Sequence, residues 1–186
     1  MPDEAEIVNR AKKGDETALA ELYETYFEPV YRYVALRVNS TADAEDITEQ
    51  VFLRMLEAIG SYQWRNTPFS AWLFRIAHNQ VVDHWRRSAR ERKLAVEMMA
   101  TSEVWRPVSA ETALEVRLRL EELVQALKQL TGAQQRVVAL RFGAELSLAE
   151  TARIMGKSEG AVKALQHSAL AAMRRILRKE EDEGTL

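Results

Sequence analysis

Apolar side chains in this sequence recur every three to four residues along almost the whole chain, and this spacing constrains the fold more than any other feature. No stretch shows the alternation with a period of two that a half-buried β-strand requires. Only seven glycines and four prolines interrupt the pattern. We therefore expect an all-α protein, and its 186 residues, 47% of them hydrophobic, are enough for one or two small helical cores.

Breaks in the pattern divide the chain into two small helical domains joined by a linker. Residues 94–110 lack a clean helical period and contain Pro107, so we interpret them as the linker. The first domain is then residues 1–93, and the second is residues 111–186. The second domain is expected to begin with a helix that ends before a capping box at Thr131.

Three long helices are predicted in the first domain. The first starts at Asp15, runs to about residue 38 and contains Pro29, which can kink it. The second covers roughly residues 41–59. The third begins at the pair Thr67-Pro68, which suits an N-cap and a first helical turn, and runs to about Arg92.

The second domain has the spacing of a helix-turn-helix unit. Ser147 is expected to open the first helix of the unit through a capping box, and Ser158 to cap the second. Ala152 is small where the helices approach, Gly156 permits a left-handed turn, and Val162 anchors the second helix. We predict that this helix enters the DNA major groove by its amino end, while an ordinary three-helix bundle remains the alternative.

Charge is unevenly distributed, although the formal net charge is only −2. Residues 1–60 hold 13 acidic and 6 basic side chains. Residues 61–93, in contrast, hold 2 acidic and 7 basic side chains, and residues 133–179 hold 3 and 9. These two basic blocks, separated and flanked by acidic segments, favour two contacts with nucleic acid.

The third predicted helix carries one narrow, mostly basic stripe on an otherwise apolar circumference. The stripe consists of Arg75, Asn79, Arg86, Arg90 and Lys93, and Asp83 and Trp72 lie at its edge. The preceding loop adds Tyr62, Trp64 and Arg65. A basic stripe beside exposed rings suits single-stranded nucleic acid, because charge follows the backbone and rings stack on unpaired bases. The alternative is that the rings belong to the core and the charges to a solvated face.

No pattern in the sequence is typical of a catalytic or metal site. The chain has no Cys and only three His, which excludes thiol nucleophiles, disulfides and thiolate metal sites. A nucleophile elbow and a glycine-rich phosphate loop are also missing. We therefore expect no enzyme activity, no cofactor and no metal. The polar start and the lack of a long apolar run predict a cytoplasmic protein without stable membrane insertion.

Four motifs, found in order along the chain, resemble those of an extracytoplasmic-function (ECF) sigma factor of the sigma-70 family. The motif at residues 44–59 reads AEDITEQVFLRMLEAI and is similar to region 2.2, which docks on core RNA polymerase. Residues 67–87 read TPFSAWLFRIAHNQVVDHWRR and look like regions 2.3 and 2.4. Residues 123–142, LVQALKQLTGAQQRVVALRF, are similar to region 4.1. Residues 146–175, LSLAETARIMGKSEGAVKALQHSALAAMRR, resemble region 4.2.

The resemblance implies roles for three groups of residues. Those implied to melt and read the −10 element are Trp64, Arg65, Trp72, Arg75, Asn79, Asp83, Arg86, Arg87 and Arg90. Those implied to read the −35 element are Lys157, Ser158, Gly160, Lys163, Ala164, His167 and Arg174. Those implied to contact RNA polymerase are Asp46, Glu49, Gln50, Phe52 and Arg54.

The resemblance also implies the partners: core RNA polymerase, promoter DNA and a cognate anti-sigma factor. Two departures from the family stand out. Glu49-Gln50 transposes the usual order on the polymerase-facing helix, and Ser168-Ala169 replaces basic residues after His167. The main alternative is a stand-alone helix-turn-helix transcriptional regulator whose first half dimerises or senses a ligand. That alternative, like a helical adaptor that binds only proteins, leaves the basic stripe unexplained.

Overall fold

The computed structural model describes residues 4–63, 67–94 and 122–183, and these residues form helices and turns without a β-strand. The all-α fold class is therefore confirmed. The helices of the first half are α1 (Glu4–Ala11), α2 (Glu16–Ala35), α3 (Thr41–Ala58), the short 3-10 helix η1 (Ile59–Ser61) and α4 (Phe69–Leu94). Residues 122–128 are helical, followed by α6 (Gly132–Val138), the π-helical turn η2 (Ala139–Gly143), α7 (Leu148–Met155) and α8 (Glu159–Glu183).

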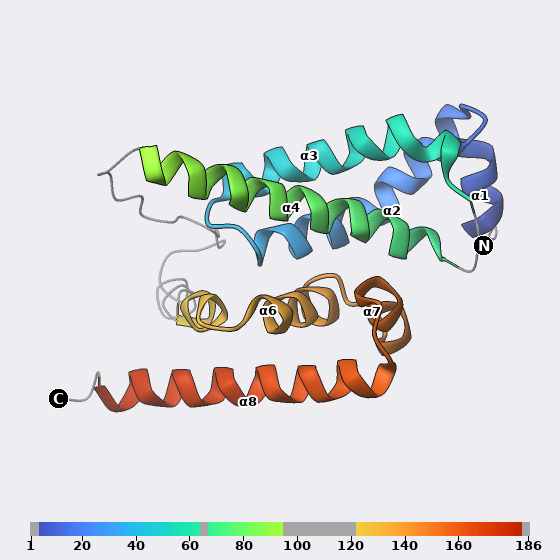
Figure 1. Cartoon of the computed structure of the whole chain (residues 1–186). Helices are drawn as coiled ribbons and strands as arrows, with labels where there is room; N and C mark the ends of the chain where they lie inside the picture. Colours follow the sequence, from blue (N-terminus) through green and yellow to red (C-terminus); the bar gives the residue numbers. More distant parts are fainter. Residues whose placement is uncertain (1–3, 64–66, 95–121, 184–186) are drawn as a thin grey trace, which may run out of the picture.

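The three long helices predicted for the first half are present as α2, α3 and α4, and Figure 1 shows them running side by side. Asp15 caps α2 and Ser40 caps α3, each accepting a hydrogen bond from a backbone N–H three residues on. Pro29 lies inside α2, which continues to Ala35. α4 begins at Phe69, one residue later than the predicted first turn, because the Pro68 carbonyl already accepts the first helical hydrogen bond from Trp72.

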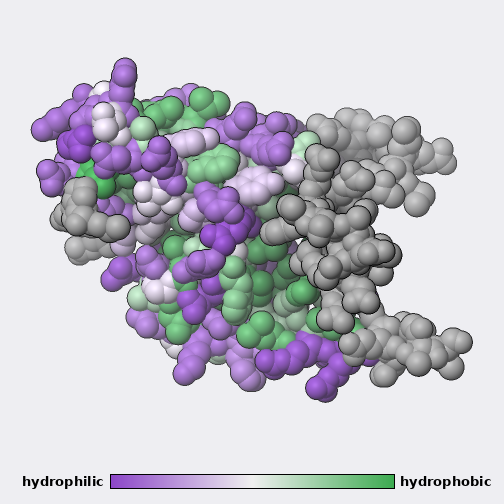
Figure 2. Space-filling view, turned by 180° about the vertical axis from the view of Figure 1, so that it is seen from behind, coloured by the Kyte–Doolittle hydropathy of each residue, from purple (hydrophilic) through white to green (hydrophobic). Residues whose placement is uncertain are grey.

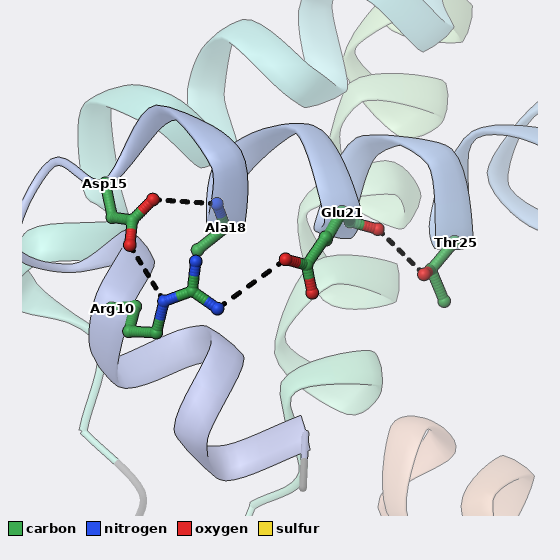
Figure 3. A network of polar contacts seen from close by, with 5 residues as sticks. All are labelled: Arg10, Asp15, Ala18, Glu21 and Thr25. Atoms are coloured by element: carbon green, nitrogen blue, oxygen red, sulfur yellow. Dashed lines mark hydrogen bonds and ion pairs between the residues drawn. The ribbon is translucent and has the colours of Figure 1, made fainter. Parts of the chain in front are cut away.

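The short helix α1 precedes these three helices and was not predicted from the sequence. Val8 and Ala11 bury its inner face, each with 2% of its surface exposed. Arg10 joins α1 to α2, because its Nε donates to Asp15 at 2.8 Å and its Nη1 lies 3.5 Å from Glu21 (Figure 3). The hydrogen bond from Arg10 lowers the pKa of Asp15, which keeps the α2 cap ionised.

The second half is built on the caps that the sequence predicts. Thr131 and Ser147 both form complete capping boxes, with Gln134 and Glu150 respectively, and so open α6 and α7. Val162 of α8 is fully buried in a small apolar cluster with Ala152 of α7. The predicted linker at 94–110 lies, apart from its first residue, outside the described residues.

The two halves pack against each other. Leu140, Leu146 and Ile154, all from the second half, belong to the same apolar cluster as the core of α1 to α4. A pocket lies along this seam, and its lining residues are Ala35, Leu36, Arg37, Val38, Asn39, Val124, Leu127, Lys128 and Gln135. Figure 2 shows hydrophobic residues gathered towards the middle of the rear face, with hydrophilic residues around the rim. One of the two apolar clusters therefore includes residues of both halves, and the division into two domains stays a prediction.

Candidate nucleic-acid interface

The basic stripe of α4 lies on the surface, as its helical phase predicts. Arg75, Asn79, Arg86 and Arg90 of the stripe and Asp83 at its edge are exposed, and so is the neighbouring Arg87. On the opposite side, Leu73, Phe74, Ala77 and Val81 have no exposed surface. Because these four side chains are buried on one face of α4, the helix cannot rotate about its axis, and the stripe faces solvent.

The stripe is positively charged over most of its length. Asp83 and Arg86 form an ion pair at 3.3 Å, three residues apart, with both side chains more than half exposed. An exposed pair of this kind contributes about 0–1 kcal/mol, so either partner can exchange it for a phosphate contact. Asn79 lies one helical turn before Asp83, where its amide is able to hydrogen-bond to a base edge.

The aromatic residues beside the stripe do not all face solvent. Tyr62 is only 4% exposed, and its hydroxyl donates to the Thr67 carbonyl at 2.6 Å. It therefore anchors the loop and is not the exposed ring that we expected. Trp72 is half-buried, with its ring centroid 5.1 Å from that of Tyr62 and 5.5 Å from that of Phe69. Part of the surface of Trp72 is therefore accessible. Two further predicted residues, Trp64 and Arg65, lie outside the described residues.

The helix-turn-helix geometry of α7 and α8 matches the prediction. Gly156 ends α7 with φ 63° and ψ 38°, a left-handed conformation that glycine adopts at least cost. Ser158 then caps α8, accepting a hydrogen bond from the Ala161 N–H at 3.2 Å. Ala152 and Val162 are buried where the two helices meet. Residues 157–161, at and just before the amino end of α8, are exposed.

The residues predicted for major-groove contacts all lie on the exposed side of this unit. They are Lys157, Ser158, Gly160, Lys163, Ala164, His167 and Arg174. Ser158 uses one lone pair of its hydroxyl oxygen as the helix cap, so the hydroxyl proton and the second lone pair are not used by the cap. Ser168, which stands where many members of the family have a basic residue, accepts a hydrogen bond from Gln134 of α6 at 3.1 Å. That contact braces α8 against α6.

The polymerase-facing surface predicted on α3 needs one correction. Asp46, Glu49 and Arg54 are exposed and Gln50 is half-buried, but Phe52 is only 4% exposed. Phe52 points inward because the core face of α3 continues through it.

The exposed apolar residues of α3 are instead Leu53 and Leu56, at 59% and 48%. They are three residues apart and share one face of the helix. Tyr23 of α2, 45% exposed, has its ring 4.8 Å from that of Phe52 and lies on the neighbouring helix. These three residues were not predicted from the sequence, although the spacing of the two leucines could have identified Leu53 and Leu56.

A buried polar cluster between the two halves was also missed. Arg37, 5% exposed, places its guanidinium 4.6 Å from the ring centroid of Trp85 and donates to the Tyr33 hydroxyl at 3.3 Å. His78 lies 3.4 Å from the same hydroxyl. Burial, reinforced by the cations Arg136 and Arg37, lowers the pKa of His78 to about 4.

In residues 4–63, 67–94 and 122–183, no group of His, Asp and Glu has the arrangement of a metal site. The helices in these ranges also offer no segment with the length and hydrophobicity of a transmembrane span. The exposed basic faces of α4 and α8 thus remain the principal candidates for a functional site.

Comparison with known proteins identifies the family. Residues 22–91 match the family described as Sigma-70 region 2, and residues 126–175 match Sigma-70, region 4. The chain is 42% identical over 173 residues to the ECF RNA polymerase sigma factor BldN of Streptomyces coelicolor, covering 92% of this chain and 65% of BldN. It is 30% identical over 178 residues to the ECF RNA polymerase sigma factor SigW of Bacillus subtilis, covering 92% of this chain and 95% of SigW.

A solved structure shows the same fold. The structure of CnrH in complex with the cytosolic domain of CnrY superimposes with a TM-score of 0.71, at 21% sequence identity. The match covers 94% of this chain and 96% of that chain. The two family matches coincide with the two basic faces, one in each half. This chain belongs to the ECF RNA polymerase sigma factors of the sigma-70 family, the proteins that direct core RNA polymerase to promoters.

Proposed function

We propose that this chain reads two promoter elements for core RNA polymerase: α4 reads a melted −10 element, and the amino end of α8 reads a −35 duplex. The observation that carries the proposal is the pair of exposed basic faces, each fixed by a buried apolar face on the same helix. One face is a stripe suited to a single strand, and the other is a helix-turn-helix suited to a major groove.

In the first half, different residues contact the backbone and the bases of the −10 strand. Arg75, Arg86, Arg87 and Arg90 follow the strand backbone with their positive charges. Asn79 reads the edge of a base that has left the stack, and the accessible part of Trp72 stacks beside it. The predicted domain boundaries follow from the same division: residues 1–93 for polymerase and the −10 element, and residues 111–186 for the −35 element.

In the second half, Lys163, Ala164 and His167 face the bases of the major groove. Lys157 and Arg174 hold phosphates on either side. The polymerase-facing surface consists of Asp46, Glu49, Gln50, Arg54, Leu53 and Leu56. This surface includes Leu53 and Leu56 and leaves out the buried Phe52. It therefore has the apolar centre and charged rim of a protein interface.

The remaining partners and the location follow from this role. A factor that works with core polymerase on chromosomal DNA acts in the cytoplasm and without catalysis of its own. A cognate anti-sigma factor is the expected inhibitory partner, because the ECF family that the chain belongs to is usually controlled in that way.

Run-off transcription with core polymerase and genomic fragments tests the function. The wild-type chain is expected to produce specific start sites that core enzyme alone does not. Asn79→Ala is expected to reduce open-complex formation while binding to core polymerase stays unchanged. The matched control is Asn9→Ala, an exposed amide on α1 outside the stripe. Tight, specific duplex binding without polymerase, and no new start sites, would instead identify a stand-alone regulator.

A further inference from the structure

Two hydrogen bonds hold α8 to other elements of the second half, one through each neighbour of His167. Arg141 of η2 donates from Nε to Oε1 of Gln166 at 3.1 Å. Gln134 of α6 donates from Nε2 to the Ser168 hydroxyl at 3.1 Å. The residue proposed to face the bases is therefore flanked in sequence by two residues whose side chains are bonded to other elements.

Helical geometry places these two bonds on opposite sides of the buried face of α8. Val162 and Ala169, which have no exposed surface, lie on that face. At about 100° per residue, Gln166 is about 60° from Ala169 on one side, and Ser168 is about 100° from it on the other. His167 is about 160° from Ala169 and is exposed. It therefore points almost directly away from the core, between the two bonded sides.

Apolar packing determines which face of α8 is buried, but it leaves room for a small roll of the helix about its axis. Hydrophobic contact has no preferred direction, whereas hydrogen bonds depend on both distance and angle. A roll of about 10° moves a side chain about 5–6 Å from the axis by about 1 Å. Base reading is sensitive to such a shift, because N–H···O distances lie within about 2.7–3.2 Å.

Arg141 also connects α8 to the first helix of the helix-turn-helix unit. Its Nη1 donates to the carbonyl of Leu146, the residue before the α7 cap Ser147. One guanidinium group thus joins the start of α7 to α8. Arg141 lies in η2, a π-helical turn, and such turns occur frequently at functional sites.

The contact at Ser168 replaces a different kind of interaction. A basic residue, which many family members have here, can hold a DNA phosphate, whereas the Ser168 hydroxyl accepts from Gln134. A phosphate contact strengthens binding to any sequence, while a contact that orients His167 affects which base is read. This difference favours a role in selectivity.

We propose that Gln166 and Ser168, held by Arg141 and Gln134, are positioning residues that set the base preference of His167 in the −35 element. They act by fixing the orientation of α8 and not by touching a base. The proposal rests on the proposed reading of a −35 duplex by α8 and names the residues that determine its selectivity.

Selection from promoter fragments with a randomised −35 element tests the proposal. Core polymerase carrying the chain is mixed with the fragments, and sequencing of the bound fraction gives the base preference at each position. A wrong base at one position ordinarily costs about fivefold or more in affinity, so a wild-type preference is measurable. His167→Ala identifies the position that His167 reads, because the preference is lost there.

Variants of Gln166 separate orientation from folding, since Arg141 also supports the Leu146 carbonyl and is left unchanged. Gln166→Met keeps the length of the side chain but removes the acceptor, and it is expected to lower the preference at the His167 position to about twofold or less. Gln166→Glu keeps the acceptor and is expected to retain the preference, although its charge weakens binding overall. Gln125→Met makes the matched exchange at an exposed position in the helix of residues 122–128 and is expected to change no preference.

Ser168 offers a second, independent pair of variants. Ser168→Ala removes the acceptor for Gln134 and is expected to lower the same preference, whereas Ser168→Thr retains a hydroxyl and is expected to preserve it. Gln134 is left unchanged because its carbonyl oxygen accepts from the Thr131 N–H in the capping box of α6. Urea midpoints are measured for every variant, because a merely structural role would change the midpoint and leave the base preference as it is.

The outcomes distinguish the positioning role from the function on which it rests. A wild-type preference at the His167 position that Gln166→Met and Ser168→Ala leave unchanged overturns the positioning role alone. Equal loss in Gln166→Glu and Ser168→Thr also overturns it, because both variants retain the hydrogen-bonding groups. A wild-type holoenzyme without any −35 preference overturns the proposed reading of that element.

Discussion

The indole Nε1 of Trp85 donates a hydrogen bond of 2.9 Å to the backbone carbonyl of Arg37, whose guanidinium lies 4.6 Å from the centroid of the same ring. This double contact joins α4 to the turn that follows α2. Arg37 is 5% exposed, so the pair belongs to the interior. Trp85 is thus a structural residue, although it sits on the helix that carries the nucleic-acid stripe.

Trp85→Phe is expected to lower the free energy of unfolding by about 1 kcal/mol, because the hydrogen bond to a buried carbonyl is lost while a ring remains. Urea denaturation followed by circular dichroism measures the change. The comparison variant is Trp72→Phe, which changes the ring proposed to stack on a base. It is expected to reduce promoter melting more than stability. An unchanged urea midpoint in Trp85→Phe would show that this hydrogen bond contributes nothing.

Ser147→Ala is expected to lower the free energy of unfolding by about 1 kcal/mol, because Ser147 and Glu150 satisfy each other's backbone N–H groups at the start of α7. Ser147→Gly is expected to cost only a few tenths of a kcal/mol, since glycine is tolerated at an N-cap. Urea midpoints of the two variants therefore test the cap itself. Within a helix the order is reversed, and a Gly variant less stable than the Ala variant would contradict the cap.

These caps and turns were predictable because their causes are local. Thr131, Ser147 and Gly156 lie within a few residues of the backbone groups that they satisfy. Helix α1 was not predictable in the same way. Its eight residues are too few to be stable alone, and they are held by burial of Val8 and by the bond from Arg10 to Asp15.

The residues of the candidate functional surfaces could be predicted where the spacing of the apolar residues shows which face of a helix is exposed. The phase of α4 placed Arg75 and Asn79 on the surface correctly, since four core residues fix it. On α3 the apolar spacing agrees with the burial of Phe52, whereas its assignment to the polymerase-facing surface was implied by the family resemblance. The contact of Gly143 with α2 joins residues more than 100 positions apart, and no local pattern carries that information.

The stability of the chain is expected to fall between pH 7.5 and pH 5.5, partly because of His78. Burial and the cations Arg136 and Arg37 lower its pKa from 6.5 to about 4 in the folded chain. The unfolded chain therefore binds a proton in this range that the folded chain does not, so the free energy of unfolding decreases as the pH falls. The stabilising contribution is complete above about pH 6.5 and is lost towards pH 4.

His78→Gln removes the group that titrates, so the difference between the urea midpoints at pH 7.5 and pH 5.5 is expected to shrink. His84 and His167 are the same in both proteins, and their contributions cancel in the comparison. Titration by NMR of the His78 ring protons provides the direct measurement. A His78 pKa near 6.5 in the folded wild-type chain would contradict the buried, positively charged surroundings.

Leu53→Ser combined with Leu56→Ser is expected to weaken binding to core polymerase at least about tenfold, the effect of losing about 1.4 kcal/mol from the centre of an interface. Both side chains are about half exposed or more, so the free energy of unfolding is expected to change little. Phe52→Leu is the comparison variant, because Phe52 is buried. It is expected to reduce stability and leave the affinity for polymerase unchanged. If Phe52→Leu weakened binding to polymerase and the double leucine variant did not, Phe52 would belong to the polymerase-facing surface.

Arg174→Ala on α8 removes a proposed phosphate contact, and it is expected to weaken binding of the holoenzyme to a −35 duplex and to make that binding less dependent on salt. Each phosphate contact contributes about 0.9 to the slope of log affinity against log salt concentration, so one lost contact lowers the slope by about that amount. Affinities measured at several salt concentrations give the slope. Lys13→Ala removes an exposed lysine in the turn after α1, far along the chain from α8, and is expected to leave the slope unchanged. Equal effects of the two variants would show that binding responds to overall charge and not to α8.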